Sequence, residues 1–446
     1  MYFILEIFRR LSKDKETANK LFWTFTILFC LIIGYRVPMP GINTEYLSSL
    51  AEFMNKTSAA GVLGTLMGNT FQQMSIFALS ITPYISASII IELLGVIFPK
   101  IGQLAKDGSV GREKLNKLTL LAAGIIAVIE SLGLSFSLGK QGLFVEYNAL
   151  MVIFTTVMWT AGACFLVWVG QFITKKLIGD GPSLILLFNI LSTLPNSFIN
   201  IYTSTSSGDV VWKNVILIVV IAVISILMFM YVLLLNNAEK RIHITNSGKG
   251  AAFMDGASKN VLPLKLNMGG VMPIIFASSF LSGPSLVATM FKLDESHWLT
   301  KISMYLNQAN WFNIDTPIYT LGLILFIPLT FAFSYFYIKM TFSPKDISDN
   351  LRKSGSILNG LRPGQPTADY LQKQMMSLFW IGTSMLIVMS LIPTFFSGMF
   401  RIDGLGFGGT SAIIIVGAIV SLKEKVLAQT SRTTYKSLTK KGKCRK

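Results

Sequence analysis

Two carboxylates, Glu92 and Glu130, lie in stretches of the chain that otherwise carry almost no charge. A charged carboxylate at the centre of a bilayer costs about 3 kcal/mol or more, so such residues mark functional sites unless they reach the interface. Glu92 lies near the end of its stretch, where its side chain could simply extend to water. The chemistry of these acids therefore depends on the helices that hold them and on the neighbours that those helices bring.

The motifs of the common enzymes are missing from this chain. His243 and His297 are the only histidines, and neither belongs to a His-Glu-x-x-His zinc motif. No Gly-x-Ser-x-Gly motif occurs within an apolar stretch, and no Gly-x-x-x-x-Gly-Lys-Ser/Thr loop could bind a nucleotide. The three cysteines lie far apart in the sequence. The sequence thus predicts that the protein is not an enzyme and has no cofactor, no metal site and no disulfide framework.

Ten apolar stretches make up most of the chain, and they are the elements that must position the two acids. A hydrocarbon core of about 30 Å requires about 20 apolar residues in a helix, so each stretch is interpreted as a membrane-spanning helix. The stretches are residues 21–35, 57–91, 118–139, 147–174, 181–208, 214–238, 266–291, 316–338, 374–400 and 404–422. The predicted fold is an all-α polytopic membrane protein with ten transmembrane helices. The stretch 57–91 is too long for one straight span.

The distribution of basic residues predicts how these helices are oriented. With the N-terminus in the cytoplasm, all but seven of the 39 Lys and Arg residues fall in cytoplasmic segments. The seven exceptions are Arg36, Lys56, Lys140, Lys213, Lys292, Lys301 and Arg401. This asymmetry follows the positive-inside rule, and ten spans place the C-terminus in the cytoplasm as well. The net charge of +17 is then mostly a consequence of topology, and it gives the inner face a field that attracts anionic lipids or nucleic acid.

The segments outside the spans also carry predictions. Residues 1–20 mix apolar and charged side chains, which is typical of an amphipathic helix on the inner membrane surface, and residues 429–446 form a basic tail. Two cytoplasmic segments, 239–265 and 341–370, are long for connections between helices. Their basic residues include Lys240, Arg241, Arg352, Lys353 and Arg362. These segments are either solvated loops, which is the simpler interpretation, or a docking platform for a large cytoplasmic partner.

Short motifs, in order along nearly the whole chain, are more specific than composition. They lie at residues 75–91 (SIFALSITPYISASIII), 111–115 (GREKL), 262–273 (LPLKLNMGGVMP), 275–279 (IFASS), 344–355 (PKDISDNLRKSG), 361–364 (LRPG) and 407–411 (FGGTS). By these motifs the chain resembles the SecY family, the channel subunits of the Sec protein translocon. The ten spans, counted independently, agree with the topology of that family.

The resemblance implies a ten-helix clamshell around an hourglass pore, with residues 21–204 (helices 1–5) facing residues 205–428 (helices 6–10). Unfolded polypeptides would cross through the pore, and transmembrane segments would leave sideways through a lateral gate. The implied partners are the small subunits SecE and SecG, the SecA ATPase, the ribosome through its RNA, anionic lipids, and secretory and membrane protein substrates. The implied location is the plasma (inner) membrane, with both termini cytoplasmic.

The resemblance also implies a ring of apolar side chains at the narrowest part of the pore. Carried over by the motifs, its members are Ile81, Ile85, Pro182, Leu186, Ile275 and Ile414. Pro182 departs from the family, which usually has a branched apolar residue after a Gly-Asn-Gly segment; here the segment is Gly179-Asp180-Gly181. A proline suits the start of a helix, because its missing amide needs no partner there.

The overlong stretch 57–91 matches a short plug helix followed by the second spanning helix in the family. The predicted plug, about residues 58–70, is uncharged and rich in glycine, and its named positions are Gly61, Leu63, Gly64, Leu66, Met67 and Gly68. Without the resemblance, the spacing Gly64-x-x-x-Gly68 would favour helix packing instead.

The resemblance assigns the two acids and the basic loops to further sites. The predicted lateral gate contains Ser86, Ser88, Glu92, Glu130 and Asn267, with Glu92 and Asn267 facing each other in a polar cluster. Both acids stand where the family usually has Gln. Lys240, Arg241, Arg352, Lys353 and Arg362 are the predicted docking residues for SecA and the ribosome.

A secondary transporter of a small solute is the alternative from a different class. Such a protein would place paired charges within the membrane and broken helices in both halves. The spans contain two acids and no embedded base, which argues against it. Within the SecY family, a housekeeping channel and an accessory paralogue both stay open.

Overall fold

The structure is a computed structural model, and it describes residues 15–43, 74–106, 108–140, 142–192, 211–246, 260–290, 297–307, 311–312, 320–353, 355–358, 361–362, 364–400 and 414–430. Within these residues nearly all regular structure is helical, with three short strands.

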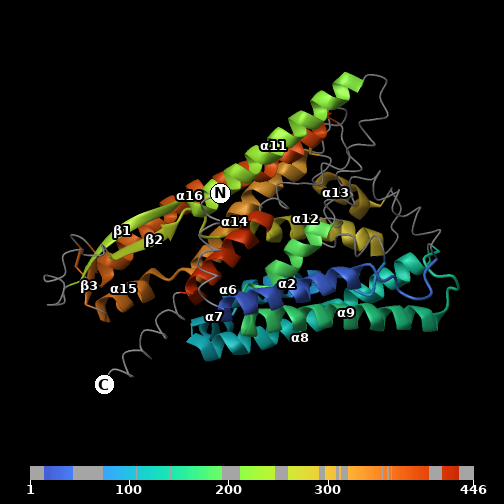
Figure 1. Cartoon of the computed structure of the whole chain (residues 1–446), viewed down its shortest axis with the longest axis horizontal. Coiled ribbons are helices and arrows are strands. Elements are labelled where there is room, and N and C mark those ends of the chain that lie inside the picture. Colours follow the sequence, from blue (N-terminus) through green and yellow to red (C-terminus); the bar gives the residue numbers. More distant parts are fainter. Residues whose placement is uncertain are drawn as a thin grey trace.

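Helices from the two parts of the chain form two layers that lie against each other (Figure 1). The first part contributes α2 (Lys15–Tyr35), α6 (Thr82–Ile97), α7 (Pro99–Lys106), α8 (Gly108–Gly139), α9 (Ala149–Lys176) and the helix Gly181–Ser192. The second part contributes α11 (Val211–Asn237), α12 (Met272–Met290), α13 (Trp298–Leu306), α14 (Leu321–Thr341), α16 (Gln365–Phe400) and a helix at 414–430. Within the layers α8 packs against α6 and α9, and α12 packs against α14; α12 also contacts α8, which joins the layers.

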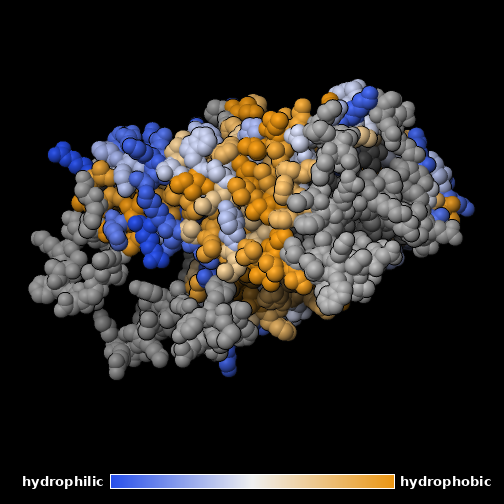
Figure 2. All heavy atoms as spheres, turned by 90° about the horizontal axis from the view of Figure 1, so that it is seen from above, coloured by the Kyte–Doolittle hydropathy of each residue, from blue (hydrophilic) through white to orange (hydrophobic). Residues whose placement is uncertain are grey.

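Each of the ten predicted spans contains a helix in the described residues. Five helical segments there are long and apolar enough to cross a membrane, and three shorter apolar helices accompany them. A space-filling view shows a broad band of hydrophobic side chains across the middle of the molecule, with hydrophilic side chains gathered beyond it (Figure 2). Many large apolar side chains of the long helices are exposed, such as Phe29 on α2, Leu150 on α9 and Ile226 on α11. Exposed side chains of this kind are expected where a protein faces lipid rather than water.

The long cytoplasmic segments of the prediction fold into a small unit of their own. Strand β1 (Glu239–Asn246) lies in the centre of an antiparallel sheet, between β2 (Asn260–Lys265) and β3 (Ser356–Leu358). The helix α15 (Pro344–Lys353) precedes β3 and contacts both β3 and the start of α16. The sequence analysis did not predict this sheet. It is an addition to the all-helical membrane part rather than a change to it.

The main apolar core joins both parts of the chain. One cluster of buried side chains includes Leu28 of α2, Ile81 at the start of α6, Leu184 of the helix Gly181–Ser192, Ile274 of α12 and Val416 in the last helix. A second cluster lies under α8 and α9, and a third lies under the sheet. The halves are therefore joined through a shared apolar centre, and the sheet is stabilised separately.

Candidate pore and gate

One face of α6 carries four of the predicted site residues. Proline at the first turn lets α6 begin at Thr82, immediately after Ile81, because proline at that position sacrifices no helical hydrogen bond. Ile81, Ile85, Ser88 and Glu92 follow at spacings of four, three and four, so they lie along a single stripe of the helix. The stripe is apolar where α6 begins and polar toward its other end.

The start of this stripe is fixed by a residue that the sequence analysis missed. Ser80, just before Ile81, adopts a left-handed conformation with φ of 51°, which is unfavourable for a residue other than glycine. Asn189, fully buried in the helix Gly181–Ser192, donates from Nδ2 to Ser80 Oγ at 3.2 Å. A buried amide without a partner is costly, so this bond ties the position of Ile81 to the neighbouring helix. An asparagine within an otherwise apolar span was the available signal.

Five of the six predicted ring residues belong to the main apolar cluster. These five residues are named here the waist. They are Ile81 and Ile85 from α6, Leu186 from the helix Gly181–Ser192, Ile275 from α12 and Ile414 from the last helix. None is more than 8% exposed. The structure thus brings together side chains that lie more than 300 residues apart in the sequence, and it fills the centre between the halves with branched apolar groups. The role of these residues as a pore ring stays a prediction, which their shared packing supports.

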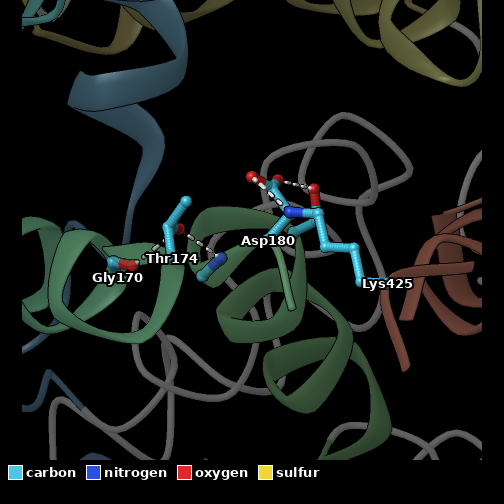
Figure 3. Close-up of polar contacts among 6 residues, drawn as sticks. Gly170, Thr174, Asp180 and Lys425 are labelled. Atoms are coloured by element: carbon cyan, nitrogen blue, oxygen red, sulfur yellow. Dashed lines mark hydrogen bonds and ion pairs between the residues drawn. The ribbon is translucent and has the colours of Figure 1, made fainter. Parts of the chain in front are cut away.

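Pro182, the sixth predicted ring residue, is only half-buried and lies against a neighbouring helix. A Cβ placed on Gly170 of α9 would come within 3.5 Å of Pro182 Cδ. The backbone around it is anchored by Thr174, whose hydroxyl donates to the carbonyl of Gly170 at 3.0 Å and accepts from the amide of Gly181 at 2.8 Å (Figure 3). Gly170 and Gly181 approach so closely that a Cβ on Gly181 would clash with the Gly170 carbonyl oxygen. Pro182 therefore has a local role in starting its helix.

An ion pair joins the two halves beside this helix start. Asp180 Oδ1 lies 3.9 Å from Lys425 Nζ of the last helix, and Asp180 Oδ2 also accepts from the hydroxyl of Ser183 (Figure 3). The two side chains are 37% and 44% exposed, so water screens their attraction. Next to it, Glu424 pairs with Lys265 at the end of β2.

The predicted gate residues are distributed over two places. Glu92 of α6 lines a small cavity whose other walls come from α12 and α14, and its Oε1 accepts from Ser88 Oγ at 3.4 Å. Ser86 lies half-buried on the same helix. Asn267 is nearly buried, and it donates from Nδ2 to Asn236 Oδ1 of α11 at 3.0 Å rather than to Glu92. The described contacts thus give Glu92 an aromatic environment and give Asn267 an amide partner within its own half.

Glu130 lies on α8, the neighbour of α6. Its Oε2 is buried and has no hydrogen-bond partner, whereas the next residue, Ser131, bonds Thr160 of α9 at 2.9 Å. Glu130 and Glu92 both remain gate predictions, but only Glu92 lines the cavity.

The five predicted docking residues are all exposed, and together they define the basic end of the molecule: Lys240 and Arg241 on β1, Arg352 and Lys353 on α15, and Arg362 before α16. Two hold local contacts, from Lys240 Nζ to Gln374 Oε1 and from Arg241 Nε to Glu239 Oε1 at 2.7 Å. Beneath them an apolar cluster includes Ile242, Leu358 and Leu371. These exposed charges are thus carried by a packed unit, and their docking role stays a prediction.

Several predictions fall on residues that the structure does not describe. They are the plug at about residues 58–70 with its six named positions, residues 1–14 of the amphipathic segment, and residues 431–446 of the basic tail. Among the described residues, no group of three His, Cys, Asp or Glu side chains could hold a metal ion.

A multi-pass helical membrane protein whose two halves meet at an apolar waist is the class that the fold and the site define. The SecY family model matches residues 75–422. The chain is 34% identical over 445 residues to the protein translocase subunit SecY of Staphylococcus carnosus, covering 97% of this chain and 99% of that protein. It is also 34% identical over 438 residues to the same subunit of Staphylococcus aureus strain NCTC 8325, with 95% and 97% covered.

Solved structures agree in fold. One described as "The structure of a protein conducting channel" matches with a TM-score of 0.64 at 18% identity, covering 92% of this chain and 91% of that chain. Sec61 in the canine ribosome-channel complex matches with a TM-score of 0.61 at 18% identity and covers 92% and 91%. These channels are ten-helix clamshells, as the sequence predicted for this chain. The chain belongs to the SecY family.

Proposed function

We propose that this chain is the channel-forming subunit of a Sec translocon, which conducts unfolded polypeptides across the membrane and releases apolar segments sideways into the lipid. The observation that carries the proposal is the waist, because its five branched apolar residues come from both halves and belong to one buried cluster. A narrow apolar constriction loses its water when no chain occupies it, and it presents no fixed hydrogen bonds to a passing chain. It can therefore exclude ions and still adapt to any side chain.

Besides a barrier to ions, the channel needs a sideways exit, and the boundary between the halves can supply one. Where α6 faces α12 and α14, the seam contains a small cavity with room for about one water molecule, and the acid Glu92 lines it. Packing contacts stabilise a closed interface, so a seam with a cavity is a weaker part of the boundary between the halves. We infer that the lateral gate opens along this seam. Ser86, Ser88 and Glu130 would line it from the first half of the chain, as Glu92 does.

The basic end supplies a place for the partners that drive transport. We propose that it faces the cytoplasm, that the membrane is the plasma membrane, and that both termini are cytoplasmic. Sec61 and the yeast Ssh1 complex are described as bound to ribosomes, and exposed Lys and Arg suit ribosomal RNA through salt-sensitive contacts. Arginine can also pair with carboxylates of SecA in a bidentate geometry. SecE, SecG and anionic lipids complete the proposed assembly, and the plug keeps the role that the resemblance implied.

The test is reconstitution of the purified chain with a SecE-type subunit, SecA and ATP in liposomes, followed by protease protection of a secretory precursor. We expect protection that requires both SecA and ATP. Protein-free liposomes and ATP omission are the controls. An intact complex that protects nothing with SecA, and nothing with translating ribosomes, would contradict the proposal.

The same assay tests the basic end. Arg362→Glu replaces an exposed docking residue, and we expect it to lower SecA-driven protection about tenfold, because an attractive charge at a docking surface becomes repulsive. Lys301→Glu is the matched control, since Lys301 is also an exposed base and lies on α13, away from the basic end (Figure 1). Equal losses in the two variants would indicate a general effect of charge and not a docking site.

A further inference from the structure

The turn that leads from β2 into α12 marks a boundary between two packed units. Met268 packs on the apolar cluster under the sheet, whereas Val271 packs on the main apolar core and Ile274 belongs to that core. Gly269 and Gly270 lie between them. The residues on the two sides of this glycine pair therefore belong to different units, and the pair itself has no side chain that could join them.

The sheet side of the boundary is firmly held. The amide of Leu266 donates to the carbonyl of Ala238 at 2.8 Å, which continues the pairing of β1 with β2. Asn267 donates to Asn236 at the end of α11. On α16, a Cβ placed on Gly382 would clash with the carbonyl oxygen of Leu266, so the two backbones touch. A movement of α12 relative to the sheet must therefore be absorbed after Asn267.

The helix side of the boundary begins immediately after the glycine pair. The carbonyl of Val271 accepts from the amides of Ile274 and Ile275 at 3.2 and 3.3 Å, as in the first turn of a helix. The helix α12 then carries Ile275 of the waist and Phe276 of the seam. Because helical hydrogen bonds resist bending, the backbone between Asn267 and Val271 is the place where α12 can change direction and carry both residues with it.

Gly270 has the backbone conformation that suits a hinge. Its φ is 62°, in the left-handed region that glycine adopts freely and other residues adopt only at a cost. A Cβ placed on Gly270 would meet nothing within 4 Å, so its surroundings leave the backbone room to turn. A turn is a contracted form of the chain, so a helix that swings away from it lengthens it, and extended backbone has negative φ.

We propose that Gly269 and Gly270 form the hinge of the gate. The helix α12 swings about them, away from α6, while the sheet stays in place, and Gly270 leaves the left-handed conformation as the gate opens. The swing parts the seam at Phe276 and moves Ile275 out of the waist. This proposal rests on the proposed channel function and deepens it, because it locates the backbone movement that regulates the gate.

The experiment measures the ion conductance of the full chain, reconstituted with its SecE-type subunit in liposomes, without a client. In Gly270→Ala the cost of the left-handed conformation falls on the closed gate alone. We therefore expect the fraction of open channels, and with it the resting conductance, to rise about tenfold. Gly270→Asn should raise the conductance less, because asparagine tolerates the left-handed conformation better than alanine does.

Gly355 offers a matched control. Its φ is 66°, and a Cβ placed on it would also meet nothing within 4 Å. It lies between α15 and β3, away from α12. Gly355→Ala therefore introduces the same kind of backbone cost outside the hinge. We expect it to lower the Tm in detergent and to leave the resting conductance unchanged.

A bend inside α12 is the competing explanation for a moving gate helix. Pro284 lacks the amide that would donate within α12, which weakens the helix at that point. However, it follows Phe276 by eight residues, so a bend there would leave Ile275 and Phe276 in place. Pro284→Ala should leave the conductance increase of Gly270→Ala intact. Loss of that increase in the double variant would move the hinge to Pro284 and refute the proposal.

The outcomes separate the hinge from the function on which it rests. If Gly270→Ala changes the conductance no more than Gly355→Ala does, while wild type still protects a secretory precursor, the hinge is refuted and the channel stands. A lower conductance in Gly270→Ala also refutes it, because the closed gate would then not be the state that needs the left-handed conformation. If wild type protects no precursor under any condition, the channel function fails, and the hinge fails with it. Should Gly270→Ala not fold, the comparison of Gly270→Asn with Gly355→Asn decides the question.

Discussion

The waist and the seam are built on the same stripe of α6, yet their chemistry is opposite. Ile81 and Ile85 enter an apolar cluster shared by both halves, whereas Ser88 and Glu92, less than two turns further along, form a polar pair beside a cavity. A site that must pass every side chain cannot carry fixed polar groups, and a site that must choose among segments needs at least one. The difference shows how one helix can contribute both to a barrier that accepts any side chain and to an exit that selects among segments.

The two regions also differ in how they are packed. At the waist, branched side chains from α6, α12, the helix Gly181–Ser192 and the last helix fill the centre, and Asn189 holds the start of α6 in place. At the seam, the contact between α6 and α14 leaves a cavity. Since close packing resists separation more than a contact with a void does, we expect the seam to part before the waist widens.

The largest expected effect comes from making the waist polar. Ile85→Ser should raise the ion conductance of the resting channel at least tenfold, because a hydroxyl in a narrow apolar constriction allows water to enter. The measurement is ion flux through proteoliposomes without a client. Ile91→Ser is a close control, since Ile91 lies on α6, is 8% exposed like Ile85, and lies about a quarter of a turn around the helix from the stripe. A leak of the same size in Ile91→Ser would show that general loosening of α6, and not the waist, lets ions through.

Making the seam apolar should have the next largest effect. Glu92→Leu removes a carboxylate whose burial costs about 3 kcal/mol and lets a leucine pack on the aromatic wall, so the closed gate becomes more stable. We expect the hydrophobicity threshold for gate opening to rise by about five leucines in a client segment, because each leucine contributes about 0.6 kcal/mol toward the roughly 3 kcal/mol. The readout is membrane integration of a leucine-for-alanine series.

The comparison for this variant is Glu130→Leu, which also removes a membrane acid but lies outside the cavity. It should shift the threshold much less. An equal shift would mean that charge anywhere on α6 and α8 sets the threshold, and an unchanged threshold in Glu92→Leu would reduce Glu92 to a residue that merely reaches toward the interface.

The sequence specified the membrane part well because its signal is local. Each run of about 20 apolar residues forms its helix in any context that excludes water, so all ten predicted runs contain a helix. The waist was predictable only through the family motifs, because Ile81 or Ile414 alone is an ordinary apolar residue in a span. Its members then proved to share one cluster.

What the sequence did not reveal depends on partners that are distant along the chain. The strand β1 pairs on one side with β2, across residues 247–259, and on the other with β3, more than 100 residues away, so local alternation gave little sign of a sheet. The bond between Asn189 and Ser80 and the ion pair between Asp180 and Lys425 have the same character. Asn267 was expected opposite Glu92, and its amide instead meets Asn236, a residue with no distinguishing motif.

A smaller effect should decide whether Pro182 belongs to the waist. Pro182 lies against Gly170 at the start of its helix, so Pro182→Ser should leave the resting ion leak unchanged and lower the free energy of unfolding by about 0.5–1 kcal/mol, through the greater freedom of the unfolded chain. Leu186→Ser, one turn further on and inside the waist, should leak like Ile85→Ser. A leak in Pro182→Ser as large as that in Leu186→Ser would place Pro182 in the ring after all.

The smallest expected effect concerns the ion pair that joins the halves beside the seam. Asp180 and Lys425 are both partly exposed and 3.9 Å apart, so their coupling should be about 0.5 kcal/mol or less. A double-mutant cycle with Asp180→Asn and Lys425→Met, followed by thermal unfolding in detergent, measures this coupling, and it should vanish as salt is raised. The pair Lys265 and Glu424, which lies within one half, is the control: breaking it should not change the client concentration needed to open the gate. If breaking Asp180–Lys425 also leaves that concentration unchanged at low salt, this pair contributes nothing to holding the halves together, and the closed state rests on the waist alone.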